Sequence, residues 1–166
     1  MPRVILIGPP GCGKSTVGAA LAQHLELSFI DTDVQVESNF GQSISDIFVD
    51  KGEDFFRELE YQVLKEALTN QDCILSLGGG APIAQRAQDL LHDVTAPIIF
   101  LDVSLAVAAP RVGFNRDRPL LLSNPRAQWQ ALAETRRPIY ESLATTIIKV
   151  DGMSVDQLVT SILGHI

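Results

Sequence analysis

One short segment near the start of the chain constrains the fold more than any other. Residues 8–15 read Gly-Pro-Pro-Gly-Cys-Gly-Lys-Ser and fit the phosphate-loop pattern G-x-x-x-x-G-K-S/T. The apolar run at 3–7 leads directly into this loop and predicts a buried strand, and the apolar spacing after it predicts a helix from Lys14 to about Leu25. An ordinary glycine-rich turn is the alternative, but the motif and its context agree. The segment therefore predicts that the chain binds a nucleoside triphosphate.

The residue types of the loop match the chemistry of phosphate binding. Gly8, Gly11 and Gly13 let backbone N–H groups turn toward phosphate oxygens, and the N-terminus of the following helix attracts negative charge. We expect Lys14 to reach the β- and γ-phosphates and the Ser15 hydroxyl to ligate Mg²⁺. The residues assigned to the nucleotide from this segment are Gly11, Cys12, Gly13, Lys14, Ser15 and Thr16.

Length and composition describe a single globular domain. The chain has 166 residues, of which 46% are hydrophobic and 20% are charged. No apolar run approaches the ~20 residues that a membrane span needs, and the first residues do not resemble a signal peptide. Cys12 and Cys73 are interpreted as reduced thiols. We expect a cytoplasmic protein that acts as a monomer and binds no membrane.

The charge of the chain limits the ligands that it can hold. A net charge of −7 argues against a nucleic-acid-binding surface, so anionic ligands must be captured by local groups of positive charge. Six of the nine arginines lie between Arg111 and Arg137. As a group they are interpreted as arginines that face a polyanionic ligand, because the guanidinium group matches phosphate and carboxylate in shape.

Apolar and amphipathic segments alternate along the rest of the chain. Strands are predicted at 3–7, 28–31, 73–77, 97–102 and 146–150, and the helical patterns between and after them include 53–68, 129–143 and 154–166. Strands separated by helices predict an α/β fold in which a parallel sheet is covered on both faces. Ligands of such sheets bind beyond the carboxyl ends of the strands, so the strand ends are where site residues are expected.

Two of these strand ends carry candidate site residues. The second strand ends in Ile30-Asp31-Thr32-Asp33, and we expect one acid to approach a metal ion and the other the acceptor; capping of the next helix is the alternative. The third strand leads into Gly78-Gly79-Gly80, whose backbone N–H groups can approach a small anion or polyol. A tight turn before Pro82 is the alternative for these glycines.

Further segments, in a fixed order along almost the whole chain, carry a family resemblance. Besides the phosphate loop they are 31–33, 41–48, 52–53, 56–60, 76–80, 118–121 and 136–140. Taken together, these segments resemble those of shikimate kinase. The resemblance implies a three-layer P-loop kinase fold with a central five-stranded parallel sheet, a helical substrate-binding segment at about 32–60 and a mobile lid at about 112–126. It also implies that MgATP phosphorylates the 3-hydroxyl of shikimate, in the route to chorismate and the aromatic amino acids.

The same resemblance implies roles on the acceptor side of the site. Asp33 would bind the shikimate hydroxyls and orient or deprotonate the one that attacks, while Asp31 would hold Mg²⁺ beside Ser15. Arg57 and Arg136 would clamp the substrate carboxylate. The full set implied for the substrate is Asp33, Arg57, Gly78, Gly79, Gly80 and Arg136. From its spacing of one helical turn, Glu60 is expected to orient the Arg57 guanidinium.

On the nucleotide side the resemblance implies two more arginines. Arg118 would reach from the lid to the transferring phosphoryl group, so the catalytic residues would be Lys14, Asp33 and Arg118. Arg111 matches the position that packs on adenine, but Pro110 precedes it inside a helical pattern and makes its direction less certain. The stretch 150–154 is shorter than the adenine-side loop of the family, which leaves the base contacts open.

Two other functions remain as alternatives from the sequence. A kinase of the same fold that acts on gluconate or a nucleoside monophosphate would share the phosphate loop but needs a different acceptor site, which the trio Asp33, Arg57 and Arg136 does not favour. A non-catalytic nucleotide-binding regulator would need a broken catalytic set, yet the residues of that set are present. The base-reading signature N-K-x-D of GTPases is absent from the sequence, which disfavours a GTP switch.

Overall fold

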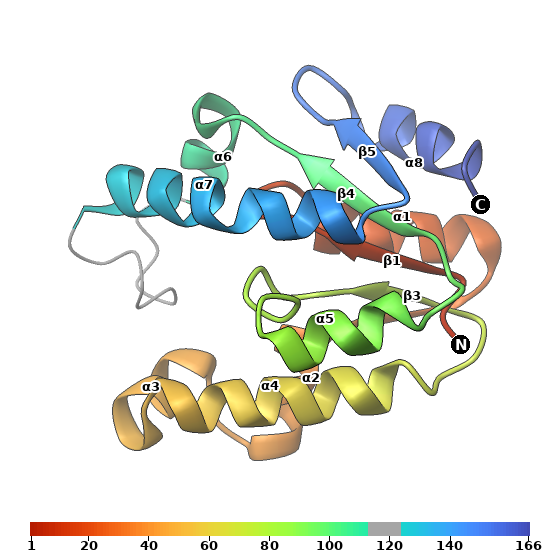
Figure 1. Ribbon diagram of the computed structural model, residues 1–166. Helices are drawn as coiled ribbons and strands as arrows, with labels where there is room; N and C mark the ends of the chain where they lie inside the picture. Colours follow the sequence, from red (N-terminus) through yellow and green to blue (C-terminus); the bar gives the residue numbers. More distant parts are fainter. Residues whose placement is uncertain (113–123) are drawn as a thin grey trace.

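A parallel sheet forms the centre of the molecule. The computed structural model describes residues 1–112 and 124–166, and within these residues five strands pair in the order β2-β3-β1-β4-β5, with all neighbours parallel (Figure 1). The strands are β1 (Val4–Ile7), β2 (Ser28–Asp31), β3 (Cys73–Ser76), β4 (Ile98–Asp102) and β5 (Thr146–Lys149). The predicted sheet is confirmed: β2 has the predicted bounds, and each of the others is one residue shorter.

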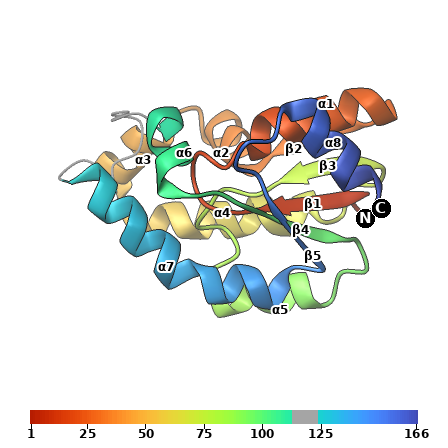
Figure 2. The same cartoon turned by 90° about the horizontal axis from the view of Figure 1, so that it is seen from above.

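Helices cover the sheet in two layers, which gives the predicted three-layer α/β fold (Figure 2). Those in the described part of the chain are α1 (Lys14–Leu25), α2 (Thr32–Phe40), α3 (Ile44–Lys51), α4 (Glu53–Ala67), α5 (Gln85–His92), α6 (Leu105–Val112), α7 (Pro125–Leu143) and α8 (Val155–Leu163). Figure 2 shows α1 and α8 on one side of the sheet and α5 and α7 on the other. None of the described helices is both long enough and apolar enough to cross a membrane.

The central strand β1 supplies both hydrophobic cores. Val4 and Leu6 point to the core that α1 and α8 cover, whereas Ile5 and Ile7 point to the core that α4, α5 and α7 cover. All four side chains are fully buried, as are the residues of β3. A strand buried on both faces has no reason to alternate apolar and polar residues, which explains why these strands read as continuous apolar runs.

The helical segment predicted at about 32–60 contains α2, α3 and the first half of α4. It has a small core of its own, built on Val36, Ile47, Phe56 and Val63. Each of its first two helices has an N-cap: the side chain of Asp31 accepts from backbone N–H groups of α2, and that of Ser43 accepts from α3. The segment therefore packs as a unit beside the sheet, below it in Figure 1.

Residues 113–123, which make up most of the lid predicted at about 112–126, lie outside the described part of the chain. Its two ends belong to helices. Val112 is the last residue of α6, in which Pro110 is an interior residue as predicted. Helix α7 begins at Pro125, four residues before the predicted start at 129, with Asn124 as its N-cap. The Asn124 side chain caps the helix and Pro125 takes its first position, where proline needs no N–H partner.

Candidate active site

A cavity of about 480 Å³ opens at the carboxyl ends of the strands, where parallel sheets bind their ligands. The phosphate loop and the start of α1 form one wall. Asp31 and Asp33 from the end of β2, together with residues 76–79 from the end of β3, form another. Residues of α6 and α8 complete the lining. The cavity thus joins the predicted nucleotide site to the predicted acceptor site.

The phosphate loop presents free backbone donors to this cavity. Gly8, Gly11 and Gly13 all have positive φ angles, a region that glycine enters without steric strain. Gly13 is the N-cap of α1 and offers no side chain to its first-turn N–H groups. These donors, together with the positive end of the helix dipole, are available to an anion.

Lys14 lies folded against its own loop. Its Nζ donates hydrogen bonds to the carbonyl oxygens of Gly8 at 2.7 Å and Pro9 at 3.1 Å, and lies 3.4 Å from Cys12 Sγ. Lys14 is only 9% exposed, and Cys12 is fully buried. The ammonium group therefore sits at the loop, among carbonyl dipoles that it can exchange for the oxygens of a more strongly charged partner.

The Ser15 hydroxyl and the Asp31 carboxylate meet between the loop and the end of β2. Ser15 Oγ donates to Asp31 Oδ2 at 2.6 Å. The other carboxylate oxygen, Oδ1, accepts from the backbone N–H groups of Asp33 at 3.0 Å and Val34 at 3.4 Å. The sequence left metal binding and helix capping as alternatives for this acid. One oxygen caps α2, and the other remains beside the hydroxyl.

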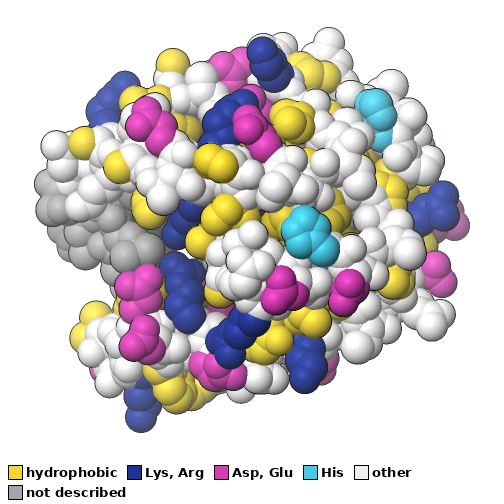
Figure 3. All heavy atoms as spheres, in the orientation of Figure 1, with side chains coloured by type: hydrophobic (Ala, Val, Ile, Leu, Met, Phe, Trp, Pro, Cys, Tyr) yellow, Lys and Arg dark blue, Asp and Glu magenta, His cyan; other side chains and the backbone are white. Residues whose placement is uncertain are grey.

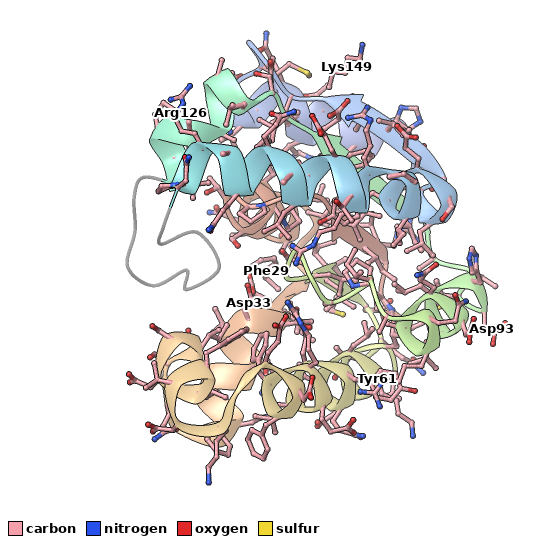
Figure 4. The ribbon with its side chains drawn as sticks, turned by 60° about the vertical axis from the view of Figure 1, so that its left-hand side comes forward. Phe29, Asp33, Tyr61, Asp93, Arg126 and Lys149 are labelled. Atoms are coloured by element: carbon pink, nitrogen blue, oxygen red, sulfur yellow. The ribbon has the colours of Figure 1, made fainter. Side chains whose placement is uncertain are left out.

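The acceptor side is built where the turn after β3 meets the start of α2. The backbone N–H of Gly78 donates to Thr32 Oγ1 at 2.9 Å, a buried contact that ties the ends of β2 and β3 together. The Asp33 carboxylate lies so close to Gly78 that a Cβ atom there would collide with it. In Figure 4 the labelled Asp33 lies between the α2–α4 segment and the rest of the fold. Thr32 lies within the family segment 31–33, but no role was expected for its side chain.

The next two glycines of the turn each face one of the predicted arginines. A Cβ atom at Gly80 would collide with the guanidinium group of Arg57. A Cβ at Gly79 would lie 3.4 Å from Arg136 Nη1 and 3.3 Å from the ring of Pro10. The triple glycine thus has a physical reason: it brings the backbone of one turn against three functional side chains and against the phosphate loop.

Arg57 is held on α4 by two acids. Its Nη1 donates to Glu60 Oε2 at 2.7 Å, and its Nη2 lies 3.5 Å from Glu53 Oε1. Glu60 is almost fully buried, and this burial raises the pKa of its carboxyl from 4.5 to about 6, while the charge of Arg57 acts to lower it. Figure 3 shows basic and acidic side chains next to one another on this face, with a small basic group between α7 and α4.

Arg136 reaches the same turn from α7. It is a buried cation, 9% exposed, one helical turn before Tyr140. Tyr140 Oη donates to the carbonyl oxygen of Gly79 at 2.6 Å, and its ring packs against Phe100 of β4 at a centroid distance of 5.2 Å. Burial raises the pKa of the Tyr140 hydroxyl, so it stays protonated as a donor. The sequence placed Tyr140 in the helical pattern 129–143 and in the family segment 136–140, with no role assigned to its hydroxyl.

Arg111 lies over the phosphate loop in spite of Pro110. Its Nη1 donates to the carbonyl oxygen of Gly11 at 3.3 Å. Met153, Val155 and Leu158 line the same cavity. Apolar side chains and a guanidinium group in one cavity can both pack against a planar heteroaromatic base. The sequence missed these three residues, because apolar side chains near the start of a helix read as ordinary core.

The other described arginines of the 111–137 group, Arg126 and Arg137, lie in different surroundings. Arg118 lies outside the described residues. Arg126 is exposed at the start of α7 (Figure 4). Arg137 makes two hydrogen bonds of 2.8 Å to the Asp102 carboxylate, on a different side of α7 from Arg136. The interpretation of the group as ligand-facing is therefore wrong for Arg137, because consecutive residues of a helix point in directions about 100° apart.

Three comparisons place these features among known proteins. A sequence model of shikimate kinase matches residues 10–166. The chain belongs to the shikimate kinase family. A shikimate kinase of Rhodococcus erythropolis is 45% identical over 166 residues and covers 97% of both chains. The solved structure of shikimate kinase from Acinetobacter baumannii in complex with shikimate has a TM-score of 0.94 at 31% identity, covering 99% of this chain and 92% of the other.

Family membership makes the chain an ATP-dependent kinase. The fold itself is more widely shared. A gluconokinase from Sinorhizobium meliloti superposes over 98% of this chain and 90% of its own, but with a TM-score of 0.61 and 19% identity. That likeness shows the fold alone. The choice of acceptor must therefore come from the side chains around the glycine turn.

Proposed function

We propose that the chain transfers the γ-phosphoryl group of ATP to the 3-hydroxyl group of shikimate and releases 3-phosphoshikimate and ADP. The observation that carries this proposal is the glycine turn after β3, where Asp33, Arg57 and Arg136 lie against consecutive glycines. Shikimate presents a carboxylate and several hydroxyls on one small ring. Two guanidinium groups match its carboxylate, and the aspartate matches its hydroxyls.

Asp33 is the acceptor-activating residue of the proposal. Its carboxylate lies at the boundary between the phosphate loop and the glycine turn, where an acceptor hydroxyl must meet the γ-phosphate. Phosphoryl transfer needs the two reacting oxygens in line and spreading negative charge neutralised, more than it needs strong base catalysis. We assign Asp33 to orienting the hydroxyl and drawing its proton.

Lys14 and Arg118 are assigned to the transferred group. The Lys14 ammonium, which now donates to carbonyl oxygens of Gly8 and Pro9, would donate to β- and γ-phosphate oxygens when ATP is bound. Arg118 lies outside the described residues, and the sequence supports its role as the cation that meets charge developing in transfer. Most of the proposed lid at about 112–126, namely residues 113–123, also lies outside the described residues, and the family resemblance supports it.

The residues beside the phosphate loop fit a magnesium ion. Ser15 Oγ and Asp31 Oδ2 are hard oxygen donors 2.6 Å apart, and Mg²⁺ prefers such ligands. In the described residues no cluster of three or more His, Cys, Asp or Glu could hold a metal alone, as expected when phosphates and water supply the remaining ligands. A Mg²⁺ ion bound here would neutralise charge on the β- and γ-phosphates.

The remaining parts of the proposal concern the setting of the enzyme. We propose that it works in the cytoplasm. We also propose that it acts as a monomer, since the phosphate loop, Asp33 and the first two glycines of the turn line one cavity without residues of a second chain. The net charge of −7 favours small-molecule ligands over nucleic acid.

Release of ADP over a panel of acceptors tests the function. We expect MgATP to be consumed with shikimate and not with gluconate or a nucleoside monophosphate. Mass spectrometry of the product should show a single phosphoryl group on the 3-hydroxyl. Release of ADP with another member of the panel and not with shikimate would contradict the proposal. Binding of ATP with no release of ADP for any acceptor would favour a nucleotide-binding regulator instead.

A further inference from the structure

The carbonyl oxygens of the phosphate loop accept hydrogen bonds from side chains of three helices, the adjoining α1 and the distant α6 and α7. Lys14 Nζ donates to Gly8 and Pro9, and Arg111 Nη1 donates to Gly11. Between them, Trp129 Nε1 donates to the carbonyl oxygen of Pro10 at 2.8 Å. The cationic side chains of Lys14 and Arg111 are also proposed to contact the nucleotide. The indole has no charge, is 5% exposed and packs in the core on the α1 side of the sheet.

The bond from Trp129 fixes the direction of a donor in the loop. In a planar trans peptide the C=O of one residue and the N–H of the next point in opposite directions. Holding the Pro10 carbonyl toward α7 therefore turns the N–H of Gly11 away from α7. A loop that binds phosphate needs its N–H groups inward and its carbonyl groups outward, because one reversed peptide would aim an oxygen at the anion.

Tyr140 makes the equivalent bond to the acceptor side. Its hydroxyl donates to the Gly79 carbonyl at 2.6 Å, which by the same planarity turns the N–H of Gly80 away from the tyrosine. Gly80 itself lies against the guanidinium group of Arg57. The turn thus keeps a backbone donor directed toward the guanidinium side, where the substrate carboxylate is proposed to bind.

Both donors stand on one face of α7. Trp129 and Tyr140 are eleven residues apart, which is close to three full turns of an α-helix, and Arg136 lies on the same face one turn before the tyrosine. The two loops that they hold also touch, since Pro10 lies 3.3 Å from the Cβ position of Gly79. One rigid helix therefore reaches both halves of the active site.

We propose that Trp129 and Tyr140 are positioning residues, Trp129 for the nucleotide-binding loop and Tyr140 for the substrate-binding turn. This inference rests on the proposed function for the identity of the two substrates. Neither side chain needs to touch a substrate, because each acts through one backbone carbonyl. Although both residues lie on α7, loss of Trp129 should therefore affect ATP binding and loss of Tyr140 should affect shikimate binding.

The test is a crossed pair of variants assayed with both substrates. Trp129→Phe and Tyr140→Phe each remove one donor and keep an aromatic ring. We expect Trp129→Phe to raise the KM for ATP and Tyr140→Phe to raise the KM for shikimate, each by roughly three- to tenfold, the factor for one neutral hydrogen bond. The KM for the other substrate should stay at its original value in each case. Thr135→Val is the matched control, because Thr135 is exposed on α7 and its hydroxyl donates only within the helix, to Ala131.

A merely structural role predicts a different result. Both variants would then melt at lower temperature with unchanged KM values, or with KM values for both substrates rising together, and either pattern overturns the inference. If Trp129→Phe fails to fold, Tyr140→Phe decides alone: an increase confined to the shikimate KM supports the proposal, and any other pattern contradicts it. The original chain is assayed alongside, so a failure of the proposed function would appear there first, as no activity with shikimate.

Discussion

The Asp33 carboxylate occupies the space that a side chain on Gly78 would need. Because Gly78 is also tied to Thr32, the residue before Asp33, the turn cannot move away without breaking a buried hydrogen bond. The position of the proposed acceptor-activating group on α2 therefore depends on the absence of a methyl group at Gly78, in the turn after β3.

We expect Gly78→Ala to lower turnover by about 10²-fold, because a displacement of this kind misplaces the attacking hydroxyl. ATP affinity should remain, since the three atoms nearest to the new methyl group all belong to Asp33. Gly164→Ala is the control: Gly164 ends α8 with φ −72° and leaves ordinary contact space for a methyl group. Steady-state kinetics and nucleotide titration give both quantities. Normal turnover in Gly78→Ala would show that Asp33 tolerates displacement and is not the group that orients the acceptor.

Asp33→Asn tests the charge of the same group without changing its size. The amide cannot draw the hydroxyl proton, so turnover should fall by ~10²–10⁴-fold while the chain stays folded and binds ATP. Asp54→Asn, at an exposed position of α4, is the matched control and should leave turnover unchanged. Turnover close to the original in Asp33→Asn would remove Asp33 from the chemistry.

Much of the fold and part of the site follow from local sequence patterns. The phosphate loop binds through its own backbone, so its residues lie together in sequence and in space. The sheet follows from apolar runs that two cores bury from both sides. Asp31 shows where such patterns stop: metal binding and helix capping both fit its place at the strand end, and its two oxygens make separate contacts.

Other site residues carry no local signal. Trp129 contacts a residue 119 positions away and Tyr140 one 61 positions away, and each meets a backbone carbonyl, which every residue has. Arg136 and Arg137 are neighbours in sequence, yet one faces the glycine turn and the other pairs with Asp102. Which of two adjacent arginines faces the ligand depends on the rotation of α7 against the sheet, and this packing is a property of the whole fold.

Arg57→Ala and Arg136→Ala should mainly weaken shikimate binding. Each removes a charge-assisted contact to a carboxylate, worth ~1.5–3 kcal/mol, and ATP affinity should change little. Lysine at either position should also be damaging, because a point charge does not reproduce the guanidinium geometry. Arg86→Ala is the control, since Arg86 pairs with Glu58 and stacks over Tyr61 outside the cavity. Calorimetric titration with each substrate separates the effects; loss of ATP affinity would place these arginines on the nucleotide side.

Arg118→Ala tests the residue whose role is inferred from the family resemblance alone. If its charge meets the charge that develops during transfer, turnover should fall far more than the ground-state affinity for ATP or shikimate. Arg126→Ala, at an exposed position of α7, is the matched control and should change neither quantity. Equal losses in affinity and turnover would make Arg118 a binding residue, and normal turnover would remove it from the mechanism.

Glu60 should make stability depend on pH in a definite direction. Burial raises the pKa of its carboxyl from 4.5 to about 6, so the folded chain holds this proton more tightly than the unfolded chain does. The stability that this group contributes is therefore fully present below pH 4.5 and is lost as pH rises through about 6. The size of the pKa change corresponds to about 2 kcal/mol.

The matched comparison is Glu60→Gln, which keeps the shape of the side chain and cannot titrate. The free energy of unfolding of the original chain, minus that of the variant, should fall by about 2 kcal/mol between about pH 4 and about pH 7. Urea titrations at a series of pH values measure this difference, and groups that titrate in both chains cancel to first order. A difference that stays constant with pH, or that rises, would mean that Arg57 outweighs burial at this carboxyl and keeps it ionised throughout. In that case Glu60 would hold Arg57 as a permanent ion pair.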